Sequence, residues 1–110
     1  MTSLMTWTAV CPAAQVPEFS GVAALVGGQQ IAVFRTADGW YGLSNWDPCS
    51  QAAVLSRGIV GDAGGEPVVA SPVYKERFSL RSGQCLDGDG VSVPVYPVRV
   101  REGVVEVGSP

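Results

Sequence analysis

The sequence predicts an all-β fold, an antiparallel β-sandwich or barrel, from three observations. Short apolar or alternating runs recur between turn signals, and no stretch keeps a helical periodicity with caps. Fourteen glycines and eight prolines are scattered along the chain, which is typical of many turns rather than of a linker. The length of 110 residues, 46% of them hydrophobic, suits one domain with a real core. We expect this domain over residues 7–108, after a flexible N-terminal segment 1–6.

The first predicted strands flank a turn of two glycines. Trp7–Val10 is a candidate first strand that ends before Pro12. Val22–Val26 and Gln30–Arg35 follow it and are joined by Gly27-Gly28. Both glycines tolerate the positive φ angles of a tight turn, so this segment predicts an antiparallel hairpin.

A third strand and a long loop are predicted next. Asp38-Gly39 is a second turn signal of the same kind and leads into a strand at Trp40–Ser44, which completes a meander. The alternation of apolar and polar residues then stops from Asn45 to Gly58. Within this stretch Asp47-Pro48 marks a loop.

Turn signals and short apolar runs alternate through the second half of the chain. The cluster Asp62–Gly65 predicts a turn, and a buried strand follows at Pro67–Ser71. Arg77–Leu80 predicts a strand that meets a hairpin turn at Arg81–Gly83. At most one short helix is expected, in one of two segments: Ala13–Phe19 or Ala52–Ser56.

The C-terminal residues predict an edge segment and a last hairpin. Pro94 and Pro97 have no backbone N–H to donate, so their stretch fits an edge strand or an extended connector. Val98–Val100 and Val104–Val107 flank Arg101-Glu102-Gly103, which predicts a closing hairpin.

Composition excludes several classes of function. The net charge is −3 and no basic cluster is present, so a nucleic-acid interface is not expected. No apolar stretch is long enough to span a bilayer, and the N-terminus lacks the pattern of a secretory signal. Three separated cysteines fit reduced thiols in the cytoplasm. The chain has no histidine, which excludes histidine-ligated metals and histidine acid–base chemistry within it.

Two segments resemble the two cluster-binding loops of Rieske proteins, which read roughly C-x-H…L-S-x-G and C-P-x-H…F-x-L-x-x-G. The first, Asp47–Gly58, reads Asp-Pro-Cys-Ser-Gln-Ala-Ala-Val-Leu-Ser-Arg-Gly. The second, Ala70–Gly83, reads Ala-Ser-Pro-Val-Tyr-Lys-Glu-Arg-Phe-Ser-Leu-Arg-Ser-Gly. The C-terminal run from Pro94 to Val107 is similar to the strand pair that closes the same fold. The resemblance implies a Rieske-like fold with a small, loop-rich subdomain where a cluster would bind.

The resemblance also implies that the cluster ligands are gone. Anchoring the loops on Leu55–Gly58 and on Phe78–Gly83 assigns other residue types to the two cysteine and two histidine positions. A Rieske cluster needs two thiolates on one iron and two imidazoles on the other. The four former ligand positions are Pro48, Ser50, Ser71 and Tyr74.

A ligand-less Rieske-like domain with these loops resembles the small subunit of bacterial NAD(P)H-dependent nitrite reductase. The match rests on Val54–Asp62 and Val69–Lys75. The resemblance implies a non-catalytic subunit that accompanies a large subunit in the reduction of nitrite to ammonium, as part of nitrate assimilation. FAD, sirohaem and a [4Fe-4S] cluster are then expected in the large subunit, and no cofactor or metal in this chain.

If the loops face a partner, their exposed residues are candidates for contact. These partner-binding candidates are Trp46, Cys49, Arg57, Tyr74 and Lys75. Each has a simpler interpretation, which for Cys49 is a small, semi-buried residue. Tyr74 could fill the space of the lost cluster, Trp46 could cover the core, and Arg57 and the Lys75–Arg77 run could be solvated charges. Ser50 and Ser71 are expected to hold the loops by hydrogen bonds.

Two other functions remain open at this point. The chain could be an electron carrier with a non-Rieske centre that involves Cys49, although its three cysteines are one short of the usual four ligands. It could also be a Rieske-derived binding module for a different oxidoreductase. Purified protein would be coloured and contain iron in the first case, and only the identity of the recovered partner would distinguish the second.

Overall fold

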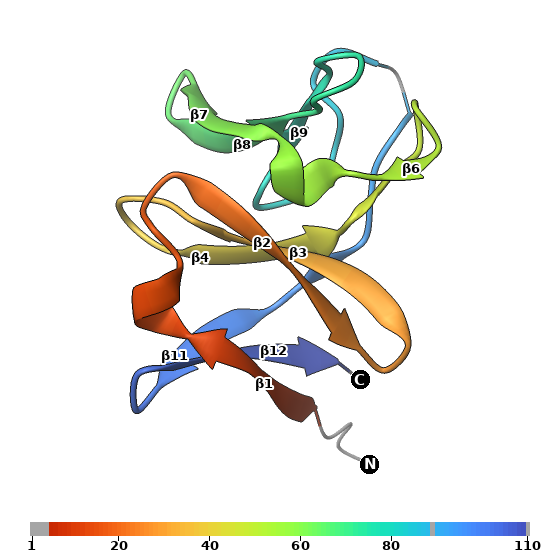
Figure 1. The fold of residues 1–110 in the computed structure, drawn as a ribbon. Helices are drawn as coiled ribbons and strands as arrows, with labels where there is room; N and C mark the ends of the chain where they lie inside the picture. The colour runs from red at the N-terminus through yellow and green to blue at the C-terminus, as the bar shows by residue number, and fades with distance from the viewer. Residues whose placement is uncertain (1–4, 89, 110) are drawn as a thin grey trace.

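The computed structural model describes residues 5–88 and 90–109, whose strands form three layers (Figure 1). The base sheet has the order β1-β12-β11, the middle sheet β10-β4-β3-β2, and the small sheet β7-β8-β9, with β5 paired to β6 beside it. Every pairing between these strands is antiparallel. The strands are β1 (Thr6–Pro12), β2 (Ser20–Val26), β3 (Gln29–Arg35), β4 (Trp40–Ser44), β5 (Trp46–Asp47), β6 (Ala52–Ala53), β7 (Ile59–Ala63), β8 (Glu66–Ala70), β9 (Arg77–Ser79), β10 (Val95–Tyr96), β11 (Val98–Arg101) and β12 (Val104–Ser109).

Strand β3 separates two hydrophobic cores. Successive side chains of a strand point to opposite faces, so Ala32 and Phe34 face one core and Ile31 and Val33 the other. The first core lies against the small sheet and η2 (Leu55–Arg57), and the second against the base sheet. All four side chains are at most 1% exposed, which explains why this strand is an unbroken apolar run in sequence.

The hairpin at Gly27-Gly28 is confirmed, and two other predicted hairpins differ in turn length. In the last hairpin Arg101 pairs with Val104, so the turn is Glu102-Gly103 alone. Gly27 and Gly28 both have positive φ, +57° and +81°, as a two-residue turn requires. The turn before β4 is at the predicted place, but Arg35 pairs with Trp40, so it spans residues 36–39. The hydroxyl of Thr36 donates a hydrogen bond of 2.6 Å to the Asp38 carboxylate and stabilises this longer loop.

Three details of the predicted elements are wrong. The first strand was expected to end before Pro12, but β1 runs to Pro12, which pairs with Val104. At most one short helix was expected, but the described residues contain two single-turn 3-10 helices, η1 (Ala13–Gln15) and η2 (Leu55–Arg57). Strand β7 was not expected, because its Gly61 and Asp62 are typical turn residues. They lie within a strand because β7 pairs along its whole length with β8, and the turn itself is at Gly64-Gly65.

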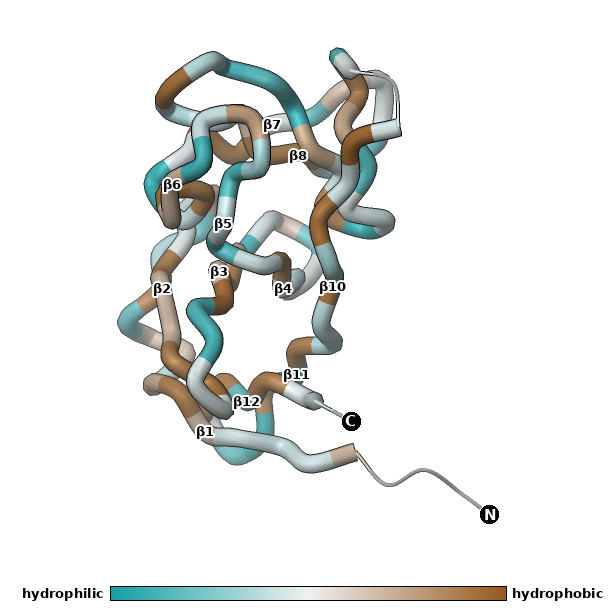
Figure 2. The backbone as a smooth tube through the Cα atoms, turned by 90° about the vertical axis from the view of Figure 1, so that its right-hand side faces the viewer, coloured by the Kyte–Doolittle hydropathy of each residue, from teal (hydrophilic) through white to brown (hydrophobic). Residues whose placement is uncertain are grey.

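The two ends of the domain lie together at the base, far from the small sheet. Thr6 of β1 pairs with Ser109 of β12, and β1 begins one residue before the expected domain start. Figures 1 and 2 show both ends on the opposite side of the molecule from β7 and β8. Residues 1–4 of the expected flexible segment lie outside the described residues. Across residues 5–88 and 90–109, helices long and apolar enough for a membrane span are absent.

Candidate functional site

Two loops beside the small sheet are closed by the same kind of backbone turn. We call residues 47–51 and 71–75 the tip loops. In the first, the Gln51 N–H donates to the Asp47 carbonyl oxygen at 2.7 Å; in the second, the Lys75 N–H donates to that of Ser71 at 3.0 Å. Gln51 and Lys75 both have the left-handed backbone, with φ of +56° and +66°. Such non-glycine residues are uncommon and are often found at functional sites.

The side chain of Asp47 joins the two tip loops. Its Oδ1 accepts a hydrogen bond of 2.9 Å from the Cys49 N–H. Its Oδ2 accepts one of 2.9 Å from the Ser50 hydroxyl and one of 2.5 Å from the Ser71 hydroxyl, 24 residues away. The Ser71 oxygen in turn accepts from the Val73 N–H at 3.3 Å. One carboxylate therefore organises its own loop and holds the other loop against it.

Asp47 is completely buried and remains a carboxylate. Burial alone would raise its pKa, but hydrogen bonds from Ser71, Ser50 and the Cys49 and Ser50 N–H groups outweigh it and hold the pKa below its ordinary value. Its side chain is 0% exposed. A buried charge is tolerated only when it is paired or well hydrogen-bonded, and these donors meet that requirement without a cation.

Asn45 anchors the first tip loop to the middle sheet. Its Nδ2 donates to the Gln30 Oε1 and to the Ala53 carbonyl oxygen, both at 3.2 Å. Its Oδ1 accepts a hydrogen bond of 2.7 Å from the Ser56 N–H. The side chain is 2% exposed, so these contacts connect β3, β6 and η2 in a buried place. The first loop thus leaves the sheet in a fixed direction.

The partner-binding candidates lie on or beside the tip loops and are all exposed. Trp46 is 50% and Tyr74 is 63% exposed, so Tyr74 does not fill the space of a lost cluster and Trp46 does not cover the core. Val73 is 47% exposed and is a further apolar residue of the tip loops that sequence reasoning did not select. The charged side chains of Arg57 and Lys75 are exposed, and so is Cys49.

Cys49 faces two carboxylates. The thiol sulfur and carboxylate oxygens of Asp47 and Glu76 lie within 4.8 Å of one another, a group that could hold a metal ion. One oxygen of Glu76 is buried without a hydrogen-bond partner. Loss of solvation and hydrogen bonding to Glu76 raise the pKa of Cys49 to about 11, so the thiol is protonated at neutral pH.

The residues of the tip loops do not fit a Rieske cluster. Pro48 and the exposed Tyr74 offer neither a thiolate nor an imidazole, and the hydroxyls of Ser50 and Ser71 are donated to Asp47. The expected hydrogen-bonding role of the two serines is confirmed. Asp47, which bonds to both, was not selected from the sequence. The signal was available, because Asp47-Pro48 and Ser71-Pro72 open two loops of the same form.

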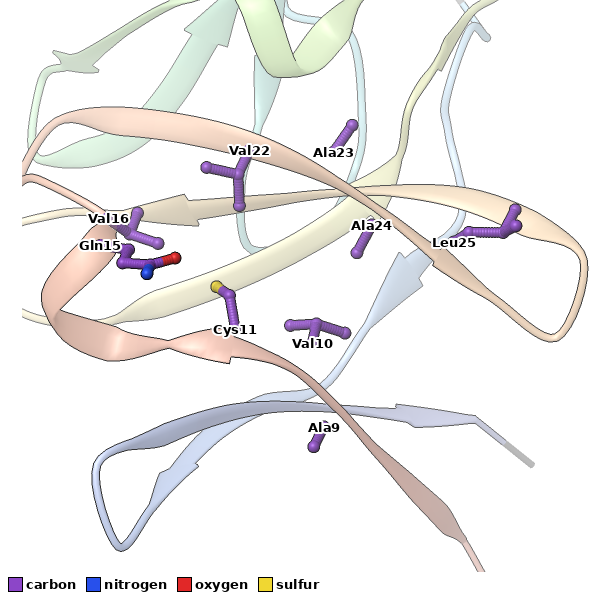
Figure 3. A pocket seen from close by; sticks show the side chains of 9 residues that line it. All are labelled: Ala9, Val10, Cys11, Gln15, Val16, Val22, Ala23, Ala24 and Leu25. Atoms are coloured by element: carbon purple, nitrogen blue, oxygen red, sulfur yellow. The ribbon is translucent and has the colours of Figure 1, made fainter.

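A pocket of about 440 Å³ lies between β1 and β2, away from the tip loops (Figure 3). Of its lining residues only Cys11 and Gln15 carry polar side chains. Burial raises the pKa of the Cys11 thiol, so it is protonated at neutral pH. The pocket therefore offers apolar contact and not acid–base chemistry.

Comparisons with known proteins agree in the family that they indicate. A model of the Rieske-like [2Fe-2S] domain matches residues 6–108. The nitrite reductase (NADH) small subunit of Salmonella typhimurium is 42% identical over 103 residues, 92% of this chain and 95% of that protein. The crystal structure of an NADH-dependent nitrite reductase small subunit from Mycobacterium tuberculosis has a TM-score of 0.94 and 46% identity, with 98% of each chain covered.

A longer protein also matches. The nitrite reductase [NAD(P)H] large subunit of Klebsiella oxytoca is 48% identical over 103 residues. These residues are 94% of this chain and 11% of that protein, so the chain corresponds to a small part of it. The same domain thus occurs in one relative as nearly a whole protein and in another as a segment of a larger one.

Proposed function

Since the chain belongs to the Rieske-like [2Fe-2S] domain family and, within it, to the nitrite reductase small subunits, we propose that it is the non-catalytic small subunit of an NAD(P)H-dependent nitrite reductase. It associates with a large subunit that reduces nitrite to ammonium in nitrate assimilation. FAD, sirohaem and a [4Fe-4S] cluster belong to that subunit, and this chain contributes an oxidoreductase subunit without a redox centre of its own. Its three free thiols and an NAD(P)H-dependent partner support a place in the cytoplasm.

The observation that carries this proposal is the presence of the same domain within a large subunit. In the Klebsiella oxytoca relative the matching residues are part of the chain named as the large subunit. In the Salmonella typhimurium relative they are nearly all of a separate small subunit. A domain that occurs both joined to a protein and apart from it is best explained as a part that works on that protein. The large subunit is therefore the partner proposed here, rather than another oxidoreductase.

We place the docking surface at the tip loops and their neighbours. It consists of Trp46, Cys49, Arg57, Tyr74 and Lys75, to which we add Val73 because it is an exposed apolar residue of the second tip loop. Aromatic and arginine side chains are enriched among residues that dominate interfaces. Thr6 and Ser109 pair at the base, so a covalent link of this domain to a larger protein would leave from there and the tip loops would remain accessible.

Co-expression with the large subunit of the same enzyme tests the function. We expect a stable complex in which iron and flavin belong to the large chain. Recovery of a different oxidoreductase instead would support the binding-module hypothesis. Iron and visible absorption in this chain alone would support an electron carrier at Cys49, whose neighbours Asp47 and Glu76 are the one group of possible ligands found among the described residues.

Alanine variants test the docking surface. Trp46→Ala with Tyr74→Ala should weaken the complex at least about tenfold, because each removes a large exposed aromatic side chain. Val100→Ala is the control, since Val100 is 40% exposed but lies on β11 in the base sheet, on the other side of the middle sheet from the tip loops. Equal affinity of the double variant and the control would show that another face binds the large subunit.

A further inference from the structure

The buried carboxylate of Asp47 is the group in the tip loops that cannot itself reach a partner. It is 0% exposed, and Ser71, its partner in the second loop, is 1% exposed. The residues proposed to contact the large subunit are their neighbours in the chain: Trp46 precedes Asp47, and Val73 and Tyr74 follow Ser71. Asp47 can therefore affect docking only by determining where the two tip loops lie.

The hydrogen bonds around Asp47 are arranged to fix that position. The bond to Ser71 crosses between the loops at 2.5 Å, whereas those from Cys49 and Ser50 fold the first loop back on the carboxylate. Each loop also closes its own turn through the N–H of a residue with left-handed backbone, Gln51 or Lys75. A left-handed non-glycine residue costs about 1 kcal/mol or more, so such loops keep their form only where other contacts hold them.

In proteins with a Rieske cluster, iron joins the two loops through ligands from each. Here the hydrogen bond from Ser71 to Asp47 makes the connection. We propose that Asp47 is a positioning residue: through Ser50 and Ser71 its carboxylate holds both tip loops in the arrangement in which the large subunit binds them. This inference rests on the proposed function and adds to it a residue that acts on docking without contact.

Affinity for the large subunit, measured with the complete enzyme partner, tests the inference. Wild-type protein must bind first, and absence of binding would refute the proposed function rather than the role of Asp47. We expect Asp47→Asn and Ser71→Ala each to weaken binding at least about tenfold, because a buried polar group loses its partner. Ser71→Thr keeps the hydroxyl and should restore affinity to within about threefold of wild type.

A matched control separates positioning from a general loss of stability. Ser79 is also 1% exposed and its hydroxyl also donates to a carboxylate, that of Glu66, at 2.5 Å. It lies on β9, outside the tip loops, so Ser79→Ala should leave affinity unchanged while it removes a similar bond. If Ser79→Ala and Ser71→Ala weaken binding equally, the role of Asp47 is purely structural and the inference is wrong.

Amide hydrogen exchange gives a readout that does not depend on the partner. In Ser71→Ala the Gln51 and Lys75 amides should exchange faster, because they close the two tip loops, while the amides of β3 stay protected. If Asp47→Asn does not fold, the Ser71→Ala and Ser71→Thr pair decides the question. Unchanged exchange at both loop amides in a folded Ser71→Ala protein, or unchanged affinity, would overturn the inference.

Discussion

The body of the molecule and its tip loops are stabilised by different interactions. In the body, which comprises the base, middle and small sheets with η2, β3 packs apolar side chains into cores on both of its faces. In the tip loops, the hydrogen bonds that fold the first loop and the one that joins it to the second converge on the carboxylate of Asp47. Apolar burial is non-directional and tolerates small shifts, whereas a buried hydrogen-bond network requires particular distances and angles.

This difference shows how a fold can keep its shape after losing a metal cluster. The body does not depend on the cluster, because its cores are formed by β2, β3, β4 and the sheets on either side. The tip loops are too short and polar to form a core, so they need a cross-link. A carboxylate with donors from both loops supplies one at a cost in desolvation that its hydrogen bonds offset.

The largest loss of stability is expected from a substitution in the hydrophobic core of the body. Phe34 is 0% exposed and its ring lies against Gly21. Phe34→Ala should lower the free energy of unfolding by about 3–5 kcal/mol, because it leaves a cavity in the first core. Urea unfolding followed by tryptophan fluorescence measures this. Leu25→Ala, at an exposed position, should change stability by no more than about 0.5 kcal/mol. A loss below about 1 kcal/mol in Phe34→Ala would contradict our account of the body.

The next effect tests the junction between body and tip. A Cβ on Gly58 would meet the Ala70 carbonyl oxygen, where η2 passes over β8. Gly58→Ala should lower the free energy of unfolding by about 1–3 kcal/mol, because the backbone at residue 58 or at Ala70 must move to make room for the Cβ. Gly61→Ala is the control: its Cβ would have no neighbour within 4 Å. The same thermal or urea unfolding measurement on both variants suffices, and similar losses would show that the close approach is unimportant.

The pH dependence of stability should distinguish the tip loops from the body. The folded pKa of Asp47 lies below its value of about 3.9 in the unfolded chain. Its stabilising effect is therefore complete above that unfolded value and is lost as pH falls through the folded pKa. Asp47→Asn should cost about 1–3 kcal/mol at neutral pH, and the difference from wild type should shrink below about pH 4.

Urea unfolding as a function of pH measures this difference. Cys49 and Glu76 also face Asp47, so the Cys49→Ser and Glu76→Gln variants should be compared in the same series. A difference that persists unchanged into acid would mean that the charge of Asp47 is not what stabilises the loops.

Local signals were sufficient to predict much of the body from the sequence. Strand β4 has the bounds expected from alternation, and the Gly27-Gly28 hairpin follows from turn chemistry. What failed depended on distant partners. Strand β7 carries turn residues and is a strand because it pairs with β8. The bond between Asp47 and Ser71 joins residues 24 apart, and no periodicity in the sequence reports it. The docking surface remains a prediction.

The smallest effect is expected from a carboxylate of similar chemistry that is exposed. Asp87 accepts hydrogen bonds from Arg77 Nη2 at 2.8 Å and from Arg77 Nε at 3.1 Å. Those bonds lower the pKa of Asp87 to about 2, so its contribution is present above the unfolded pKa and is lost in strong acid. Water and salt screen an exposed ion pair, so Asp87→Asn should lower the free energy of unfolding much less than Asp47→Asn does. The effect of Asp87→Asn should vanish at about 1 M salt. Paired urea titrations at low and high salt measure both. If Asp47→Asn and Asp87→Asn lower the free energy of unfolding equally, burial does not explain why Asp47 stabilises the tip loops. The number of hydrogen bonds that Asp47 accepts would then be the remaining explanation.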